Sequence, residues 1–574
     1  MKQLIFASFL FFSFSVHAQN ADTNHPFAIE DARMDNYLHN RNLPTLIIQV
    51  NNMPDSIKKI NIEYTLVTFG ANFQIQKFTQ TDSKGLASIV LYQNLPYQQI
   101  WLSVGDYLYA GIYVNTDLTV IIDASKIKKD GVFMFGEGVT YSGVDGEFNS
   151  DMDKHVLFKH DEQEKLQNDL RSACFERSKL PVLIFSERID SIHQVLNQID
   201  DSFIHQFPKY GWAIRNETSS MFYGNLCTSY WNATMPENLF SEINEHRPFF
   251  TSNDGVLFYN YLYMYIVTRK NNSLPPFDDN LLFKNYNQYD AKRQALLDTL
   301  KDYNQLNGQQ RIEKASAIKA VEKRERNLFA QEIGIFKDVN FIHIIDSIYK
   351  EPKSDILKTF LLNTSKDEFA LAYPKIIKSI KTEWCKQIAT NELAESNIKQ
   401  KRIDSLLALS KQINNTDNFI GKPLETLPFD ASLYRLDSIK NIDQLILDLK
   451  SKFKNKALVI DFWATWCAPC LSELPFSKKL HEENKDLPIE YVYICTNSSS
   501  NENTWKNKVV GLELPGTHIF MDDKIVSELK SSFDNAGSGF PTYVVIDVNG
   551  KLRPKAIQWM ESLDRDKLKT AVGL

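Results

Sequence analysis

The stretch that decides the fold of this chain reads Asp461-Phe462-Trp463-Ala464-Thr465-Trp466-Cys467-Ala468-Pro469-Cys470. It overlaps the apolar run 457–462, which is typical of a buried central strand, and it leads into a helical pattern over 471–482. Two residues between the cysteines let both sulfur atoms meet at the start of that helix. Unpaired N–H groups there favour negative charge, so we expect the Cys467 thiol to ionise readily. Pro469 suits a first helical turn because its missing N–H would lack a partner.

A Cys-x-x-Cys pair also has interpretations without catalysis. A zinc site would need a second pair of Cys or His ligands at suitable spacing, and none lies near Cys467 and Cys470. A structural disulfide stays open, because exported proteins oxidise neighbouring cysteines. We therefore expect no metal and no cofactor other than the redox-active disulfide of Cys467 and Cys470.

A second motif, Gly539-Phe540-Pro541-Thr542, directly precedes the apolar run 543–547. The strand followed by Trp-Cys-x-Pro-Cys, together with this proline, resembles the active site of thioredoxin-fold proteins. In that family the proline has a cis peptide bond and shapes the groove that holds the partner. The resemblance implies that Trp466, Phe540, Pro541 and Thr542 bind the substrate.

The C-terminal part resembles, more narrowly, the TlpA/ResA-like branch of exported thiol–disulfide oxidoreductases. Residues 419–423 are similar to the opening segment of that branch, and 470–475 to its active-site helix with an acidic residue and a kinking proline. Residues 503–506 fall in the extra helix of the branch. The resemblance covers about 419–574, and the motif at 81–85 is similar to sandwich modules of multidomain exported Bacteroidetes proteins.

Two acidic residues lie close to the cysteines in the sequence. Asp461 stands six residues before Cys467, where thioredoxins place a buried carboxylate that moves a proton for the second cysteine. A carboxyl group in a buried strand resists ionisation, although an aspartate at a strand end can also reach water. Glu473 is expected to tune the thiols as in the family, but helix N-termini favour acids in any case. We take Cys467, Cys470, Asp461 and Glu473 as the candidate catalytic residues.

The remaining sequence predicts a multidomain protein. Short β-branched runs at 46–50, 60–64, 87–91 and 118–122, separated by turn residues, predict a small antiparallel β-sandwich over 40–125. Apolar residues at helical spacing over 188–207, 288–303, 309–328 and 391–413 predict an all-α middle region over 145–415. The alternation of strand and helix from 419 to 574 predicts an α/β thioredoxin-like fold.

The N-terminus has the features of a signal peptide over 1–18. Lys2 precedes the apolar run 4–16, and Val16-His17-Ala18 suits cleavage. The run is too short to span a bilayer comfortably, so we expect an exported mature protein without a stable membrane span, in the periplasm or cell envelope. The formal net charge of −6 gives no electrostatic case for nucleic acid as a partner.

Other candidate residues carry weaker signals. The isolated cysteines are expected to be buried free thiols, although a bridge among them stays open: Cys174, Cys227, Cys385 and Cys495. His155 and His160 lie among acidic residues, but their spacing fits no standard metal motif and suggests a solvated turn.

These observations lead to a hypothesis of dithiol–disulfide exchange. Cys467, which we expect to be the exposed cysteine at the helix end, would attack a protein disulfide held along 540–542. Cys470 would then release the partner, with Asp461 or Glu473 taking up a proton. The TlpA-like resemblance implies protein-disulfide reduction with an electron donor in the envelope. Two alternatives stay open: a protein-binding scaffold with a non-catalytic thioredoxin-like module, and a disulfide oxidase or isomerase.

Overall fold

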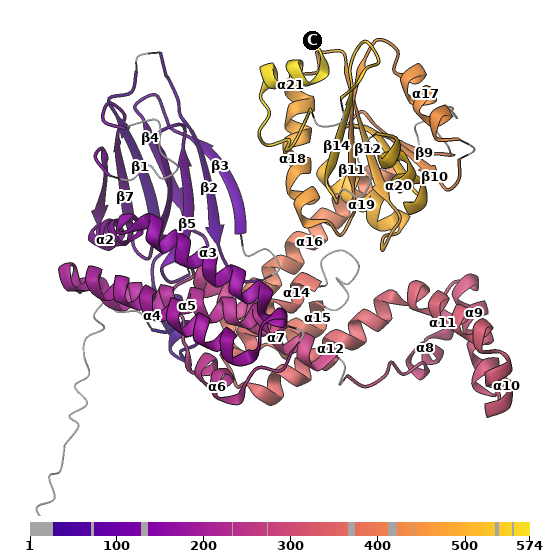
Figure 1. Ribbon diagram of the computed structural model, residues 1–574, viewed down its shortest axis with the longest axis horizontal. Coiled ribbons are helices and arrows are strands. Elements are labelled where there is room, and N and C mark those ends of the chain that lie inside the picture. Colours follow the sequence, from indigo (N-terminus) through magenta and orange to yellow (C-terminus); the bar gives the residue numbers. More distant parts are fainter. Residues whose placement is uncertain are drawn as a thin grey trace, which may run out of the picture. The chain divides into compact units, whose positions relative to one another are not determined.

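The computed structural model in Figure 1 describes residues 27–574, apart from 55, 71–73, 94, 128–135, 232, 272–273, 365–372, 411–421, 440, 534–538 and 554–555. Contacts within the chain divide it into two units, Met1–Thr390 and Asn391–Leu574. The division falls inside helix α16 (Glu383–Ser410). The predicted signal peptide over 1–18 lies outside the described residues, as does the expected start of the thioredoxin-like region at 419.

The first unit begins with two four-stranded sheets that share one apolar core. One sheet has the order β4 (Leu86–Val90), β1 (Thr45–Asn51), β7 (Leu118–Asp123), β8 (Val139–Gly143). The other has the order β3 (Gln74–Gln80), β2 (Asn61–Val67), β5 (Gln98–Val104), β6 (Leu108–Val114). Alternate residues of β1 are buried between the sheets, as the period of a strand requires. The predicted N-terminal sandwich is confirmed.

The sandwich is not wholly antiparallel, so that part of the prediction is wrong. Strands β1 and β7 pair in parallel, with Leu46 opposite Leu118 and Val50 opposite Ile122. Parallel neighbours need a long connection, and the chain supplies one because it builds β2 to β6 between them.

Helices make up the rest of the first unit, which confirms the predicted helical middle region. An aromatic cluster joins them to the ends of the strands: Tyr97 and Tyr113 pack with Phe148, Phe203 and Phe250.

No helix among the described residues is both long and apolar enough to cross a membrane. The helices are α1 (Met34–Asn40), α2 (Gly146–Leu157), α3 (His160–Glu176), α4 (Val182–Gln206), α5 (Gly211–Ser229), α6 (Glu237–Glu245), α7 (Asn253–Asn271), α8 (Asn280–Lys284), α9 (Ala291–Asn304), α10 (Gly308–Glu313), α11 (Ala315–Leu328), α12 (Ala330–Ile348), α13 (Lys353–Thr359), α14 (Leu361–Thr364), α15 (Tyr373–Ser379) and α16.

The solvated turn expected around His155 is wrong. His155 belongs to α2 and is buried, with its Nε2 atom 2.8 Å from Oδ1 of Asp200 on α4. The acidic residues close to His155 in the sequence suggested a solvated segment. In the structure, helices α2 and α4 bury acidic side chains together with the histidine. His160 begins α3 and keeps 36% of its side chain exposed.

The second unit is built on one mixed sheet of seven strands, in the order β15-β14-β11-β12-β13-β10-β9. Strand β11 (Ala457–Trp463) is buried along its whole length, parallel to β12 (Ile489–Thr496) and antiparallel to β14 (Thr542–Ile546). The other strands are β9 (Lys422–Leu427), β10 (Ala431–Leu436), β13 (Gly516–Met521) and β15 (Leu552–Arg553). The sheet and its helices confirm the predicted thioredoxin-like α/β fold, which Figure 1 shows in orange and yellow.

Each face of this sheet has its own apolar core, because successive residues of β11 point to opposite sides. Val459 and Trp463 pack with α18 (Ala468–Glu483), α19 (Glu502–Leu512) and α21 (Arg565–Val572). Ile460 and Phe462 pack with α17 (Ile442–Lys452) and α20 (Asp523–Ser532). The alternation places Asp461 on the face of Val459 and Trp463, which is also the face covered by the helix that carries the cysteines.

Candidate redox-active site

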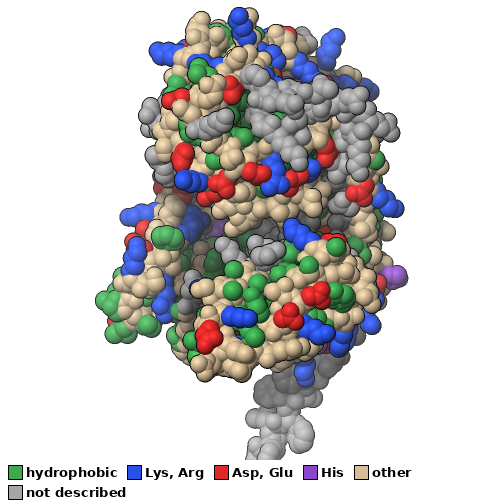
Figure 2. Space-filling view, turned by 90° about the vertical axis from the view of Figure 1, so that its right-hand side faces the viewer, with side chains coloured by type: hydrophobic (Ala, Val, Ile, Leu, Met, Phe, Trp, Pro, Cys, Tyr) green, Lys and Arg blue, Asp and Glu red, His purple; other side chains and the backbone are tan. Residues whose placement is uncertain are grey.

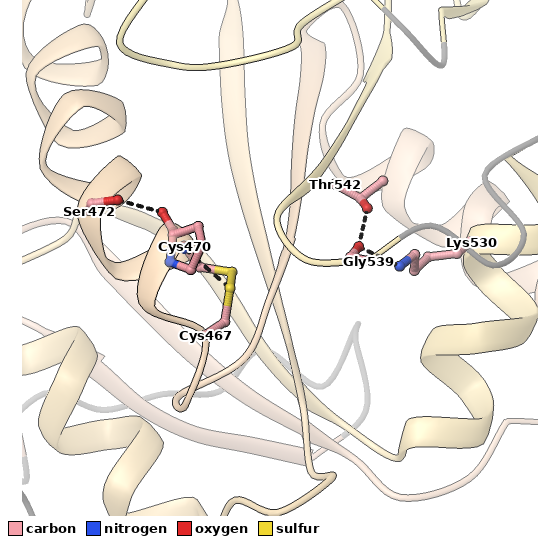
Figure 3. Close-up of a disulfide and its surroundings, with 7 residues drawn as sticks. Cys467, Cys470, Ser472, Lys530, Gly539 and Thr542 are labelled. Atoms are coloured by element: carbon pink, nitrogen blue, oxygen red, sulfur yellow. Dashed lines mark hydrogen bonds between the residues drawn. A yellow bond between two sulfur atoms is a disulfide. The ribbon is translucent and has the colours of Figure 1, made fainter. Parts of the chain in front are cut away.

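The two cysteines form a disulfide at the N-terminus of α18. Their Cα atoms lie 5.3 Å apart, and Figure 3 shows the bond at the first turn of the helix. Cys467 is the N-cap residue, and its sulfur accepts a hydrogen bond from the backbone N–H of Cys470 over 3.2 Å. Pro469 occupies the first turn, where no intrahelical N–H partner is lost. The sulfur of Cys467 therefore faces the positive end of the helix dipole.

Cys467 is more enclosed than the sequence suggested. It was expected to be the exposed cysteine, yet it retains only 4% of its surface, against 1% for Cys470. The neighbouring Trp466 is 54% exposed, and its indole N–H donates to the carbonyl oxygen of Ser498 over 2.7 Å. Apolar neighbours account for the enclosure, because both cysteines belong to the same core cluster as Trp463.

The loop before β14 lies against this core cluster. Its Phe540–Pro541 peptide bond is cis, and the Phe540 side chain packs against the cluster that contains both cysteines. The rings of Trp466 and Phe540 meet edge to face, with centroids 6.1 Å apart. Thr542 pairs with Phe462 of β11, and its hydroxyl donates to the Gly539 carbonyl over 2.6 Å, as Figure 3 shows. Of the four residues predicted to bind substrate, Trp466 and Phe540 are thus in contact with each other beside the cysteines, and Pro541 and Thr542 directly follow Phe540 in the chain.

Asp461 is buried beneath the site, with 2% of its surface exposed. None of the described residues donates a hydrogen bond to its Oδ1 atom. Burial, reinforced by the negative charge of Glu473, raises the pKa of Asp461 to about 8. The alternative of a strand-end aspartate that reaches water does not hold. The carboxyl group can instead retain a proton near neutral pH.

Glu473 is also buried, and its carboxylate accepts hydrogen bonds from the backbone of the segment before α21. Its Oε2 atom accepts hydrogen bonds from the backbone N–H groups of Met560, over 2.6 Å, and Glu561, over 3.4 Å. The side chain therefore ties α18 to the segment before α21. The negative charge of Glu473 also raises the pKa of Asp461.

The four other cysteines are unbridged and buried: Cys174, Cys227, Cys385 and Cys495. Burial raises the pKa of each thiol well above its ordinary value, to about 12 for Cys174. A thiol that stays protonated is a poor nucleophile, so these residues pack as small apolar groups.

Lys530 lies beside Gly539, three residues before β14, and is a further residue of the site that the sequence does not reveal. Its Nζ atom donates to the Gly539 carbonyl over 3.0 Å (Figure 3). No motif marks this lysine. Its position four residues after the buried Val526 of α20 is the one signal that places it on the apolar side of the helix.

Across the described residues, no three His, Cys, Asp or Glu side chains are grouped to hold a metal ion. On the face shown in Figure 2, basic and acidic side chains are interspersed, without a broad patch of one sign.

Comparison with known proteins points to the same part of the chain. Residues 441–572 match the Redoxin family. The thiol-disulfide oxidoreductase ResA of Oceanobacillus iheyensis is 27% identical over 138 residues, which are 22% of this chain and 61% of that protein. ResA of Bacillus anthracis is 30% identical over 117 residues, or 19% of this chain and 62% of that protein. The chain thus spans less than two thirds of these relatives.

A solved structure is also similar to part of the chain. The thiol:disulfide interchange protein of Chlorobium tepidum is 25% identical and aligns with 22% of this chain and 85% of its own, with a TM-score of 0.20. The match of residues 441–572 with the Redoxin family, together with the sequence similarity to ResA, identifies these residues of the multidomain chain as a redoxin domain related to the ResA-like thiol-disulfide oxidoreductases.

Proposed function

We propose that this protein is an exported thiol–disulfide oxidoreductase that reduces disulfides of other proteins. The observation that carries the proposal is the Cys467–Cys470 disulfide at the N-terminus of α18, with the loop of Phe540 and Pro541 packed beside it. A dithiol at the positive end of a helix dipole is acidic enough to supply a thiolate, which is the reactive species in exchange.

The reaction begins from the reduced form of the site. The Cys467 thiolate attacks one sulfur of the substrate disulfide, so that a mixed disulfide forms and the other substrate sulfur leaves as a thiolate. Cys470 loses its proton and attacks the Cys467 sulfur, which releases the second substrate sulfur. The substrate has then gained two electrons, and Cys467 and Cys470 have lost them. A dithiol donor in the envelope restores the site by the same exchange in reverse.

Asp461 is the group best suited to accept the proton of Cys470. It lies on the sheet face covered by α18, and a pKa of about 8 lets it both hold and release a proton near neutral pH. Water has little access to this buried carboxyl, so a proton placed there is not lost at once to solvent.

The activity can be tested by reduction of insulin with dithiothreitol as the donor. We expect turnover by the wild-type protein and its loss in Cys467→Ser; activity of Cys467→Ser at the wild-type level contradicts the proposal. Equilibration with glutathione buffers gives the direction, because reductants of this fold lie near about −270 mV and strong oxidants near about −120 mV. N-terminal sequencing of the protein from the cell envelope tests export and cleavage after Ala18.

The enclosure of Cys467 favours a second candidate function, a protein-binding scaffold with a structural disulfide. The two candidates differ in what Cys470→Ser does. A catalyst accumulates mixed disulfides through Cys467 when Cys470 cannot resolve them, whereas a scaffold accumulates none. Trapping in envelope extracts, with Cys467→Ser/Cys470→Ser as the control, separates them.

A further inference from the structure

Lys530 is a buried lysine beside the loop that precedes β14. Only 5% of its surface is exposed, although lysine is among the residues least often buried. Among the described residues of this loop, its ammonium group contacts two: it donates a hydrogen bond to the Gly539 carbonyl and lies 4.4 Å from the centre of the Phe540 ring. Burial lowers the pKa of Lys530, which reflects the cost of placing a charge there.

Both contacts end on the two residues that precede the cis proline. The Gly539 carbonyl accepts from Lys530 and also from the Thr542 hydroxyl, so its orientation is held by two donors. A charge-assisted hydrogen bond is stronger than a neutral one, and a cation over a ring face adds further attraction when water is excluded. Lys530 thus restrains the backbone and the ring of this turn at once.

Phe540 connects this restrained turn to the residues around the two cysteines. Its ring packs against the core clusters on both faces of the sheet, and its edge-to-face partner is the exposed Trp466 beside Cys467. A ring fixed between the two clusters gives the loop one preferred orientation next to the disulfide.

We propose that Lys530 is a positioning residue for the protein substrate. It holds the Gly539–Phe540 turn in one conformation, so that the turn forms a ready-made surface that binds the substrate residues on either side of the target disulfide. The inference rests on the proposed function and deepens it. Lys530 acts through Phe540 and takes no part in the exchange of electrons. A binding surface that is already ordered loses less conformational entropy when the substrate binds. Loss of Lys530 should therefore weaken the binding of a protein substrate more than it slows the reduction of a small disulfide.

The test compares Lys530→Met, which keeps an unbranched chain out to Cε but removes the ammonium group, with Lys530→Arg and with Lys524→Met. Lys524 lies on the same helix with 84% of its side chain exposed, so its variant controls for loss of a positive charge. For Lys530→Met we expect KM for insulin to rise about tenfold while kcat and the reduction of a small aromatic disulfide change less than about twofold. Lys530→Arg should recover most of the loss, and Lys524→Met should match the wild type.

Hydrogen exchange of the peptide that covers 539–543 supplies a readout independent of activity. Faster exchange in Lys530→Met, but not in Lys524→Met, supports the restraint even if the wild-type protein reduces no disulfide, an outcome that would overturn the proposed function alone. Unchanged exchange and unchanged KM in Lys530→Met overturn the inference. Equal losses of insulin and small-disulfide reduction, together with a lower Tm, also overturn it, because they indicate a general structural role.

Discussion

Among single residues, Asp461 has an environment that couples the stability of the second unit to pH. Its carboxyl group is buried with an oxygen that none of the described residues satisfies, and its pKa rises from the ordinary 3.8 to about 8. The folded protein therefore keeps a proton that the unfolded chain releases above pH 4. Stability falls as pH rises between about 4 and 8 and levels off above that range, because the unfolded state binds fewer protons there.

Replacing Asp461 with Asn should remove this dependence. We expect Asp461→Asn to raise the free energy of unfolding at pH 7 by up to about 4 kcal/mol, because no ionisable group remains to be held neutral. Denaturant unfolding of the second unit at pH 5, 7 and 9 measures the effect. If the wild type and the variant show the same slope with pH, the carboxyl group is not titrating as described.

The same substitution should affect the exchange reaction. In the wild type, the attack of Cys470 on the mixed disulfide should accelerate as pH rises through about 8, since Asp461 then becomes an available proton acceptor. Asp461→Asn should flatten that profile while leaving the first attack by Cys467 unchanged. Single-turnover kinetics on a small disulfide separate the two steps.

Glu473 influences the same carboxyl from α18. Glu473→Gln removes a negative charge that raises the pKa of Asp461, so the pH at which the resolving step accelerates should move to a lower value. The substitution also weakens the hydrogen bonds to the N–H groups of Met560 and Glu561, for which we expect a loss of about 1 kcal/mol in stability. A resolving step with an unshifted pH profile would show that Glu473 serves only to anchor the segment before α21.

Among the elements, β13 depends on a glycine at its first position. Gly516 has φ of 115°, and a Cβ atom there would lie 2.7 Å from the Tyr491 carbonyl oxygen of neighbouring β12. We expect Gly516→Ala to destabilise the second unit by about 2–4 kcal/mol through strain and clash. Gly308, where an added Cβ meets nothing within 4 Å, provides the control, and Gly308→Ala should leave Tm nearly unchanged.

The elements that could be predicted from the sequence are those with a strong local pattern. The apolar run 457–462 became β11, and the alternating run 46–50 became β1. Strand β3 was not predicted, because its side chains are mostly exposed and it carries no period-two apolar signal. Strand β13 was also missed: it is fully buried, but Thr517 and His518 interrupt its apolar character.

In the candidate site, too, contacts between residues close in the sequence could be predicted, whereas contacts between residues far apart in the sequence could not. The spacing of Cys467 and Cys470 at a helix start is local, so the sequence predicted their approach. The hydrogen bond that the backbone N–H of Met560 donates to Glu473 joins residues 87 positions apart, and no sequence pattern marks such a contact. The enclosure of Cys467 likewise depends on how the loop of Phe540 packs, which the spacing of residues does not express.

At the scale of the whole molecule, all residues of the proposed exchange reaction belong to one unit. Both core clusters of the second sheet consist of residues between 427 and 572, and they include the two cysteines. The ion pair of Arg402 and Glu513 attaches the last part of α16 to α19 within the same unit. A unit with its own core is expected to fold independently.

This arrangement predicts that residues 391–574 fold and exchange disulfides without the rest of the chain. We expect the fragment to unfold in one cooperative transition and to reduce a small aromatic disulfide with kcat/KM within about twofold of the full-length value, because no group of the exchange reaction lies outside it. The Cys467→Ser fragment is the matched control. A fragment that is folded but much less active would show that the first unit contributes to the reaction itself, whereas a selective loss on insulin would assign the sandwich and helices to recognition of the protein partner.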